Sequence, residues 1–464
     1  MFNVNPPSRL WKFCGLVILC LFTTALGLRA ADTLNWRVEQ DRVDAQIKAW
    51  ELPKLLEHIA TATGWQIYVE PKATHTTTAR FENLPPGEAL QRLFGKLNYA
   101  LLPQSNAPAK LFVFSTSLSE ATQLVRGKIK FRPAKAIPNE LIVTLKPGAG
   151  ESIEDLAKRL GAKITGRVDG LNTYRLQFQD EAAAQAARDA LSNNGDLALV
   201  DYNYGVNPPI QPQNLAFSSA PSFSLKPATG GDGRSIIGLI DTAVQSGGSG
   251  FKDFLLPAVA VAGDATPSDN LPTHGTSMME TILRGLAQMP APADGTPVRI
   301  LPVDVYGNSA TTSTYDVAKG IYEAVNGGAQ IVNLSLGSSG DSQFLHNIIK
   351  QGYDQGVLFV AAAGNVSTDA PTYPAAYTEV LAVTAGDKQR NIASYANYGS
   401  FVDVVGPSST IVTFNGKAYY VTGTSASTAY ISGVAAGLAG STGKKPTEIV
   451  PQIIQVFGVK PTAK

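Results

Sequence analysis

The second half of the chain alternates between two kinds of apolar pattern. Short runs rich in Val, Ile and Ala predict buried strands, whereas apolar residues that recur at every third or fourth position predict helices. The predicted strands lie at residues 236–240, 298–303, 331–335, 357–362 and 380–383. The predicted helices lie at residues 276–288, 315–326, 343–355 and 425–438. This alternation predicts an α/β fold, in which helices cover a parallel sheet and the functional site lies at the strand ends.

Residues 127–206 show another order of elements: strand, helix, strand, strand, helix, strand. The predicted strands lie at 140–146, near 164, at 174–178 and at 197–202, with helices at 152–160 and 180–193. Ser152 is suited to cap the first of these helices, because Asp155 follows it at the spacing of a capped first turn. This βαββαβ order predicts a small, ferredoxin-like α+β domain.

Residues 32–120 predict a second small α+β module. Leu52, Leu55, Leu56 and Ile59 lie at helical spacing before Gly64, which ends the helix. A strand at 65–69, a helix after the prolines at 85–86 and a strand at 110–114 follow. This pattern resembles the short N-terminal domain of bacterial secretins and TonB-dependent receptors. The resemblance makes the module a candidate to bind a partner in the cell envelope.

The first 31 residues have the pattern of an export signal. Arg9 and Lys12 precede an uncharged apolar stretch at 13–28, and the small residues Ala30 and Ala31 follow. The alternative is an uncleaved membrane anchor, but the stretch is shorter than the ~20 residues of a spanning helix. A lipid anchor at Cys20 is disfavoured, because the residues before it are not small. We therefore expect an exported protein, in a periplasm or outside the cell.

Charge and cysteine content exclude several classes of function. The chain of 464 residues carries 38 Lys and Arg against 37 Asp and Glu, a net charge of +1, so no strong field attracts nucleic acid. Its two cysteines, Cys14 and Cys20, both lie in the export signal. The cleaved chain would have no thiol, which excludes disulfides, cysteine catalysis and thiolate metal sites.

Residues 207–233 are rich in Pro, Gly and Ser and have no apolar period. This composition predicts an unstructured linker between the βαββαβ domain and the α/β domain at 234–464. A linker of this kind is open to proteolysis.

Four polar residues stand at predicted strand or helix ends. Asp241 and Asn365 follow strands, and His274 and Ser425 lie at helix starts. Each alone is ordinary, because Asp and Asn favour turns and Ser favours helix caps. A serine at a helix N-terminus also faces the positive end of the helix dipole, which stabilises an oxyanion. Few chemistries other than acyl transfer need Asp, His, Asn and Ser at one sheet edge.

Several short segments resemble the signature blocks of the subtilisin-like serine peptidases, in the order of that family. They lie within residues 234–438, at 239–242, 274–276, 335–337, 362–365 and 423–425, with further similar loops at 373–375 and 394–399. The resemblance implies a catalytic triad of Asp241, His274 and Ser425, with Asn365 as oxyanion donor. It also implies that the βαββαβ domain is an inhibitory pro-domain.

The same resemblance implies the substrate and its binding residues. An extended polypeptide would pair with Ser335, Leu336 and Gly337 as an added strand, and Gly364 would lie beside the oxyanion donor. Gly337 would leave room for the substrate's side chains. The pro-domain would act in cis, as a partner that blocks the groove until the linker is cut.

Three positions depart from the family pattern. Glu280 stands where family members usually carry glycine, Ser427 where they carry alanine, and Ala429 where they carry proline. None of the three removes a catalytic group. Glu280 brings a charge to a place that is normally packed closely, so it must find a partner or water. We expect it to be the main cause of any loss of activity.

Other functions remain as alternatives. A sedolisin-type peptidase would use a glutamate in place of His274 and an aspartate in place of Asn365, and the residues present argue against it. A binding module that uses the fold as a scaffold would not activate Ser425. A metal-dependent hydrolase is disfavoured because no His, Asp or Glu cluster has ligand spacing. We expect no cofactor and no required metal.

Overall fold

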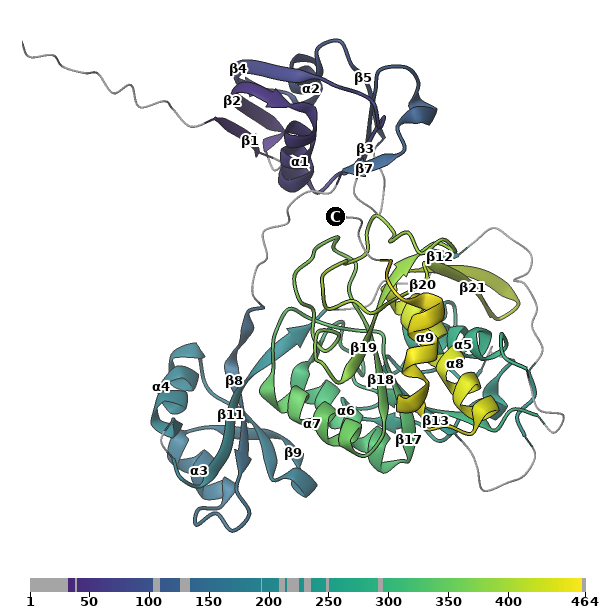
Figure 1. Ribbon diagram of the computed structural model, residues 1–464. Coiled ribbons are helices and arrows are strands. Elements are labelled where there is room, and N and C mark those ends of the chain that lie inside the picture. Colours follow the sequence, from purple (N-terminus) through teal and green to yellow (C-terminus); the bar gives the residue numbers. More distant parts are fainter. Residues whose placement is uncertain are drawn as a thin grey trace, which may run out of the picture.

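The computed structural model describes residues 32–37, 40–102, 109–125, 134–192, 194–207, 213–214, 225–228, 235–247, 250–290 and 295–460. Three units follow one another along the chain, each with its own sheets and helices (Figure 1). The predicted export signal lies outside the described residues, as do most of the predicted linker and the last residues of the chain.

The first module contains two sheets and two helices. Its strands are β1 (Thr33–Arg37), β2 (Arg42–Glu51), β3 (Gln66–Val69), β4 (Thr76–Leu84), β5 (Asn98–Leu102), β6 (Lys110–Phe114) and β7 (Gln123–Val125). The helices are α1 (Leu52–Thr63) and α2 (Pro86–Phe94). The strand orders are β1-β2-β4 and β5-β6-β3-β7. The predicted helices and the strands β3 and β6 are confirmed, and the core lies between the helices and both sheets.

The second unit has the predicted βαββαβ order. Its elements are β8 (Ala136–Leu145), α3 (Ile153–Leu160), β9 (Lys163–Val168), β10 (Thr173–Gln177), α4 (Glu181–Leu191) and β11 (Leu197–Val206). The strand order is β11-β8-β10-β9, and every pairing is antiparallel. Ser152 caps α3 as expected, by accepting a hydrogen bond from the backbone N–H of Asp155.

The large unit is built on a seven-stranded sheet in which every pair of neighbours is parallel. The order is β14-β15-β13-β17-β18-β19-β20. The strands are β13 (Ser235–Asp241), β14 (Val259–Ala260), β15 (Val298–Asp304), β17 (Ala329–Leu334), β18 (Leu358–Ala362), β19 (Val380–Gly386) and β20 (Val404–Pro407). The predicted parallel sheet is therefore confirmed, with β14 and β20 added at its edges.

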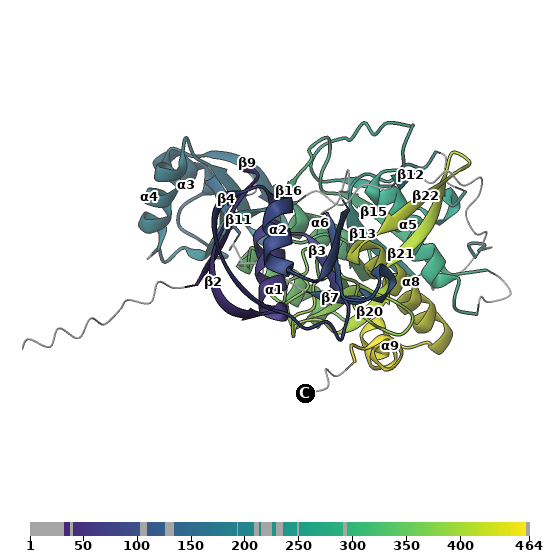
Figure 2. The ribbon, with the colours of Figure 1, turned by 90° about the horizontal axis from the view of Figure 1, so that it is seen from above.

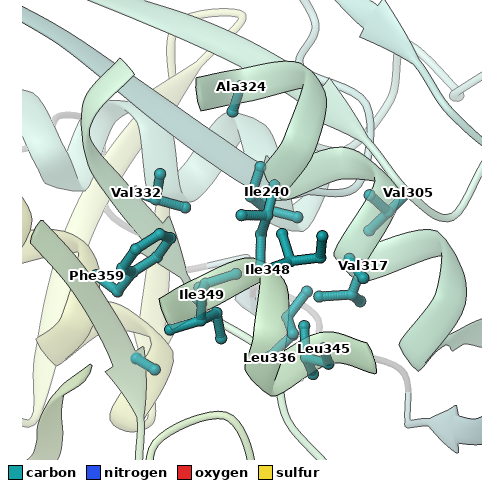
Figure 3. Packing of buried hydrophobic residues seen from close by; sticks show 14 of the residues in the cluster. Ile240, Val305, Val317, Ala324, Val332, Leu336, Leu345, Ile348, Ile349 and Phe359 are labelled. Atoms are coloured by element: carbon teal, nitrogen blue, oxygen red, sulfur yellow. The ribbon is translucent and has the colours of Figure 1, made fainter. Parts of the chain in front are cut away.

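Helices cover both faces of this sheet. They are α5 (His274–Leu286), α6 (Thr314–Asn326), α7 (Gln343–Asp354), α8 (Thr424–Thr442) and α9 (Val450–Phe457). Side chains from α6 and α7 pack on one face of the sheet, where Ile240, Ile349 and Phe359 meet (Figure 3). Side chains from α5, α8 and α9 pack on the other. Two buried layers hold the strands rigidly, so the side chains at the strand ends have fixed positions.

The βαββαβ unit packs directly on α6 and α7. Ile142 of β8 and Val168 of β9 belong to the same buried cluster as the side chains of these helices. Strand β11 continues into the large unit, where its last two residues pair with the short strand β16 (Thr312–Ser313). Arg175 of β10 forms an ion pair of 2.9 Å with Asp316 of α6. The two units therefore share a core and a sheet.

The predicted linker is not free of structure along its whole length. Strand β12 (Gln213–Asn214) pairs with β22 (Lys417–Thr422), which forms a hairpin with β21 (Ser409–Phe414). Pro227 forms an isolated bridge with Thr296. The prediction of an unstructured linker is wrong at these positions, because the outer edge of β22 offers unpaired backbone groups that an extended segment can bond. Figures 1 and 2 place β12 and the hairpin on the side of the sheet away from α3 and α4.

Candidate active site

Asp241 and His274 meet at the carboxyl edge of the large sheet. Asp241 is the last residue of β13, and His274 is the first residue of α5. Nδ1 of His274 lies 2.8 Å from Oδ1 and 2.9 Å from Oδ2 of Asp241, and both side chains are buried. The carboxylate therefore favours the tautomer with its proton on Nδ1, which leaves Nε2 as a base.

Ser425 lies in the first turn of α8. Its Oγ donates a hydrogen bond of 3.1 Å to the carbonyl oxygen of Ser335, and Oγ of Ser335 donates one of 3.0 Å to the carbonyl of Ser425. These two bonds hold α8 to the end of β17. Within the described residues, no hydrogen bond joins Ser425 to His274. Hydrogen bonds between catalytic side chains are often long before substrate binds, and they tighten only in the complex with substrate.

Asn365 lies in the loop after β18 and is held by the residue before Ser425. Its Oδ1 accepts hydrogen bonds of 2.9 Å from the backbone N–H and 3.1 Å from Oγ1 of Thr424. The amide nitrogen lies near Gly423, where a Cβ would come within 3.3 Å of it. An N–H donor is therefore positioned at the helix N-terminus that carries Ser425, where the helix dipole also favours negative charge.

The predicted substrate strand begins directly after β17. Ser335 contacts Ser425 as described, and Leu336 is buried in the core. Gly337 also meets a loop of its own chain, and its role in leaving room for substrate stays a prediction. A Cβ at Gly337 would lie 3.0 Å from both Cγ2 of Thr372 and the carbonyl oxygen of Tyr373, so this glycine allows a loop of the same chain to approach closely.

A second aspartate beside the site was missed by the sequence analysis. Asp304 ends β15 and pairs in register with Asp241. Its Oδ1 accepts hydrogen bonds from the backbone N–H groups of Tyr306 and Gly307, whereas its Oδ2 is buried and has no partner among the described residues. Burial raises the pKa of Asp304. Its position at the end of a predicted strand was the signal that could have found it.

Glu280 has the partner that the sequence analysis required. Its Oε1 lies 2.6 Å from a guanidinium nitrogen of Arg284, one turn later in α5, and its Oε2 accepts a hydrogen bond of 2.8 Å from the backbone N–H of Thr413. Burial raises the pKa of Glu280 despite these contacts. The carboxylate ties α5 to β21 and does not contact the Asp241–His274 pair.

The described residues contain no group of three or more His, Cys, Asp or Glu side chains that could hold a metal ion. None of the helices in the described part of the chain combines the length and apolar character needed to cross a bilayer.

The candidate site combines an aspartate–histidine pair, a serine at a helix N-terminus and an amide donor. Together with the parallel sheet, these features define the class of α/β serine hydrolases.

Comparisons with known proteins identify the family within that class. Residues 232–449 match the Subtilase family, and residues 130–203 match the fervidolysin N-terminal prodomain. Thermitase from Thermoactinomyces vulgaris is 34% identical over 220 residues, which cover 46% of this chain and 77% of thermitase. A thermophilic serine proteinase from Bacillus sp. (strain AK1) is 39% identical over 159 residues, 34% of this chain and 39% of that protein's length.

Among solved structures, fervidolysin from Fervidobacterium pennivorans, a keratinolytic enzyme related to subtilisin, matches with a TM-score of 0.54 and 19% identity. The match covers 69% of this chain and 57% of fervidolysin, and it supports the shared fold. The chain belongs to the subtilase family. It is a subtilisin-like serine protease with a fervidolysin-like pro-domain.

Proposed function

We propose that the chain is an exported endopeptidase made as a precursor that cuts itself. Asp241, His274 and Ser425 form its catalytic triad, and Asn365 stabilises the oxyanion. The observation that carries the proposal is the buried pair in which Nδ1 of His274 lies 2.8 Å from Asp241, at the sheet edge that Ser425 also borders. A histidine oriented in this way is suited to act as a general base.

The reaction begins when the Ser425 hydroxyl leaves the carbonyl of Ser335 and turns toward Nε2 of His274. His274 takes the hydroxyl proton while Oγ attacks the scissile carbonyl carbon, which gives a tetrahedral oxyanion. The imidazolium then gives the proton to the leaving amine as the C–N bond breaks, and the acyl group stays on Oγ. Water then attacks the acyl carbon while His274 takes its proton, and His274 gives that proton to Oγ of Ser425 as the acyl–Oγ bond breaks. Asp241 stabilises the imidazolium in both halves.

The oxyanion is stabilised by two donors, the side-chain amide of Asn365 and the backbone N–H of Ser425. Thr424 occupies the Oδ1 side of Asn365, so the amide N–H bonds remain for the developing charge. Loss of one such side-chain donor lowers kcat by about 10²–10³-fold, a magnitude for which a subtilisin supplies the known example.

The path of the chain on either side of the site supports cutting in cis. Val206 pairs with Thr312, and the carbonyl of Asn207 accepts a hydrogen bond from the hydroxyl of Tyr306. The charge of Asp241 contributes to the raised pKa of Tyr306, after the larger effect of burial, so this tyrosine lies near the triad.

Farther along the chain, Gln213 pairs with β22, the strand that leads to Ser425. We therefore expect the cut between Val206 and Gln213, within the wider interval 205–233 that the sequence suggests.

A fluorophosphonate probe tests whether Ser425 is activated. Full-length wild-type protein is treated with the probe beside Ser425→Ala and His274→Ala, and the modified residue is located by peptide mass mapping. Labelling of Ser425 in the wild type, with none in either variant, is the expected result. A wild-type serine that ignores the probe would favour the alternative of a binding scaffold. The bond from Ser425 to the carbonyl of Ser335 is the observation that keeps this alternative open.

A further inference from the structure

Asn397 lies in the loop after β19, and its side chain is fully buried. It belongs to the segment 394–399, which resembles a family loop in sequence but has no role in the mechanism above. The residues that its side chain hydrogen-bonds all belong to the loop after β18, which carries Asn365. Its place in the fold therefore connects it with the oxyanion donor.

Every hydrogen-bonding position of the Asn397 side-chain amide is used on that loop. Its Nδ2 donates bonds of 2.7 Å to the carbonyl of Ala363 and 3.1 Å to Oγ1 of Thr372. Its Oδ1 accepts bonds of 3.1 Å from the backbone N–H of Val366 and 3.3 Å from that of Thr368. One side chain therefore satisfies backbone groups both before and after Asn365.

The backbone adds a further bond on the same segment. The N–H of Asn397 donates a hydrogen bond of 2.9 Å to the carbonyl of Gly364. Gly364 has a φ of +112°, and a Cβ there would lie 2.4 Å from Nδ2 of Asn397, so the contact requires glycine at this position. Gly364 and Val366, the two chain neighbours of Asn365, are thus both bonded to Asn397.

We propose that Asn397 is a positioning residue that holds Asn365 in place as the oxyanion donor, an inference that rests on the proposed function. Asn397 fixes the backbone on both sides of Asn365, while Thr424 fixes its side-chain oxygen. The amide of Asn365 is then pre-oriented before substrate binds. Oxyanion stabilisation depends on such pre-orientation, because the donors must meet a charge that exists only in the transition state.

Removal of the Asn397 side chain leaves two backbone N–H groups and one carbonyl of the loop without their partner. The loop is then expected to shift so that these groups reach water or new partners. A displacement of ~1 Å at a catalytic donor lowers the rate by up to about 100-fold. We therefore expect Asn397→Ala to lower kcat by about 10- to 100-fold, with KM within about twofold of wild type.

A double-mutant cycle separates this role from a merely structural one. Asn397→Ala is made in the full-length wild-type chain and in Asn365→Ala, and each precursor is left to cut itself. The readouts are the rate of self-cleavage by intact mass, and kcat and KM on a chromogenic peptide amide. If Asn397 acts through Asn365, its substitution changes kcat by less than about twofold once Asn365 is absent. An equal loss in both backgrounds would overturn the proposal.

Two further variants keep the experiment decisive. Asn397→Ser keeps a hydroxyl that can donate and accept, and it replaces the alanine variant in the cycle if that variant does not fold. Asp403→Ala is the matched control, because Asp403 also bonds a backbone N–H, that of Ala382, but on the far side of β19 from the oxyanion loop. It is expected to lower thermal stability while kcat is unchanged. If Asn365→Ala itself leaves kcat unchanged, the oxyanion assignment fails, and this inference fails with it.

Discussion

Oδ2 of Asp201, in the last strand of the pro-domain, accepts a hydrogen bond of 2.9 Å from the backbone N–H of Phe344, in the first turn of α7. Nearby in the same strand, Oδ1 of Asn203 accepts one of 3.0 Å from the backbone N–H of Tyr315, in the first turn of α6. The first N–H groups of a helix have no partner within the helix. The pro-domain therefore caps two helices of the peptidase unit.

Asp201→Ala should loosen the hold of the pro-domain after cleavage. Loss of a helix-capping acceptor costs about 1–2 kcal/mol, which corresponds to about five- to thirtyfold weaker binding. In the full-length chain, we expect a shorter delay between the cut, followed by intact mass, and the appearance of activity on a chromogenic peptide.

Ser152→Ala is the matched control for this prediction. Ser152 caps α3 inside the pro-domain, so its loss destabilises the pro-domain without removing a contact to α6 or α7. The delay should shorten less than in Asp201→Ala. Equal delays in the two variants would show that capping across the interface is unimportant.

Asp241→Asn should nearly abolish activity while the fold is kept. The amide can donate to Nδ1 of His274 and so favour the wrong tautomer, and the corresponding change in another serine peptidase lowers kcat by about 10⁴-fold. Asp304→Asn removes the neighbouring charge but no contact to His274, and it should lower kcat far less. The measurement is kcat on a peptide amide for both variants. A comparable loss of kcat in both variants would mean that the total negative charge near His274, rather than the hydrogen bond from His274 to Asp241, supports catalysis.

Glu280 should make stability fall as pH rises. Because burial raises its native pKa, the folded state holds the proton more tightly than the unfolded state. This contribution is complete below the unfolded pKa of about 4.3 and is lost as pH rises through the higher native pKa. In the Ser425→Ala background, which prevents self-digestion, Glu280→Gln should show a weaker decline in urea midpoint over that range. Glu448→Gln, at an exposed position, should behave as the parent does.

Glu70 should have the opposite dependence, confined to the first module. The backbone N–H groups of Thr116 and Ser115 donate to its carboxylate and lower its pKa to about 2. Its contribution to stability is therefore present above the unfolded pKa of about 4.3 and is lost as pH falls toward the native value. Glu70→Gln should remove this acid-dependent loss.

Tryptophan fluorescence can follow this change selectively. The chain has 4 tryptophans, one in the predicted export signal and the others, Trp36, Trp50 and Trp65, in the first module. Thermal unfolding of the signal-less Ser425→Ala protein at several acidic pH values therefore reports that module alone. If the stability of Glu70→Gln falls with acid just as that of its parent does, Glu70 is not the cause of the acid-dependent loss.

Much of the peptidase fold could be predicted because its central strands are buried on both faces and appear as continuous apolar runs. The hairpin β21–β22 was missed: its strands show neither a continuous buried run nor a regular alternation, and Glu280 of α5 holds it from a distance in sequence. Strand β2 was also missed, although Val43, Ala45 and Ile47 show the alternation of a strand with one buried face.

The candidate site residues could be recognised because each stands at an element end with a short motif around it. Their supporting residues could not be. Asp201 and Phe344, or Asn397 and Val366, are far apart in sequence, and the hydrogen bonds between them depend on how whole units pack. Buried polar groups of this kind carry no periodic signal, so they are found only when the structure gives each backbone group its partner.

Intact mass of the signal-less chain, residues 31–464, tests the central claim most directly. Wild type and Ser425→Ala are purified side by side and followed over time. The account predicts that wild type releases a fragment that ends between Val206 and Gln213, while Ser425→Ala stays whole. If neither protein is cut and the wild-type serine also ignores a fluorophosphonate, the chain is not a self-processing peptidase and the scaffold alternative replaces it.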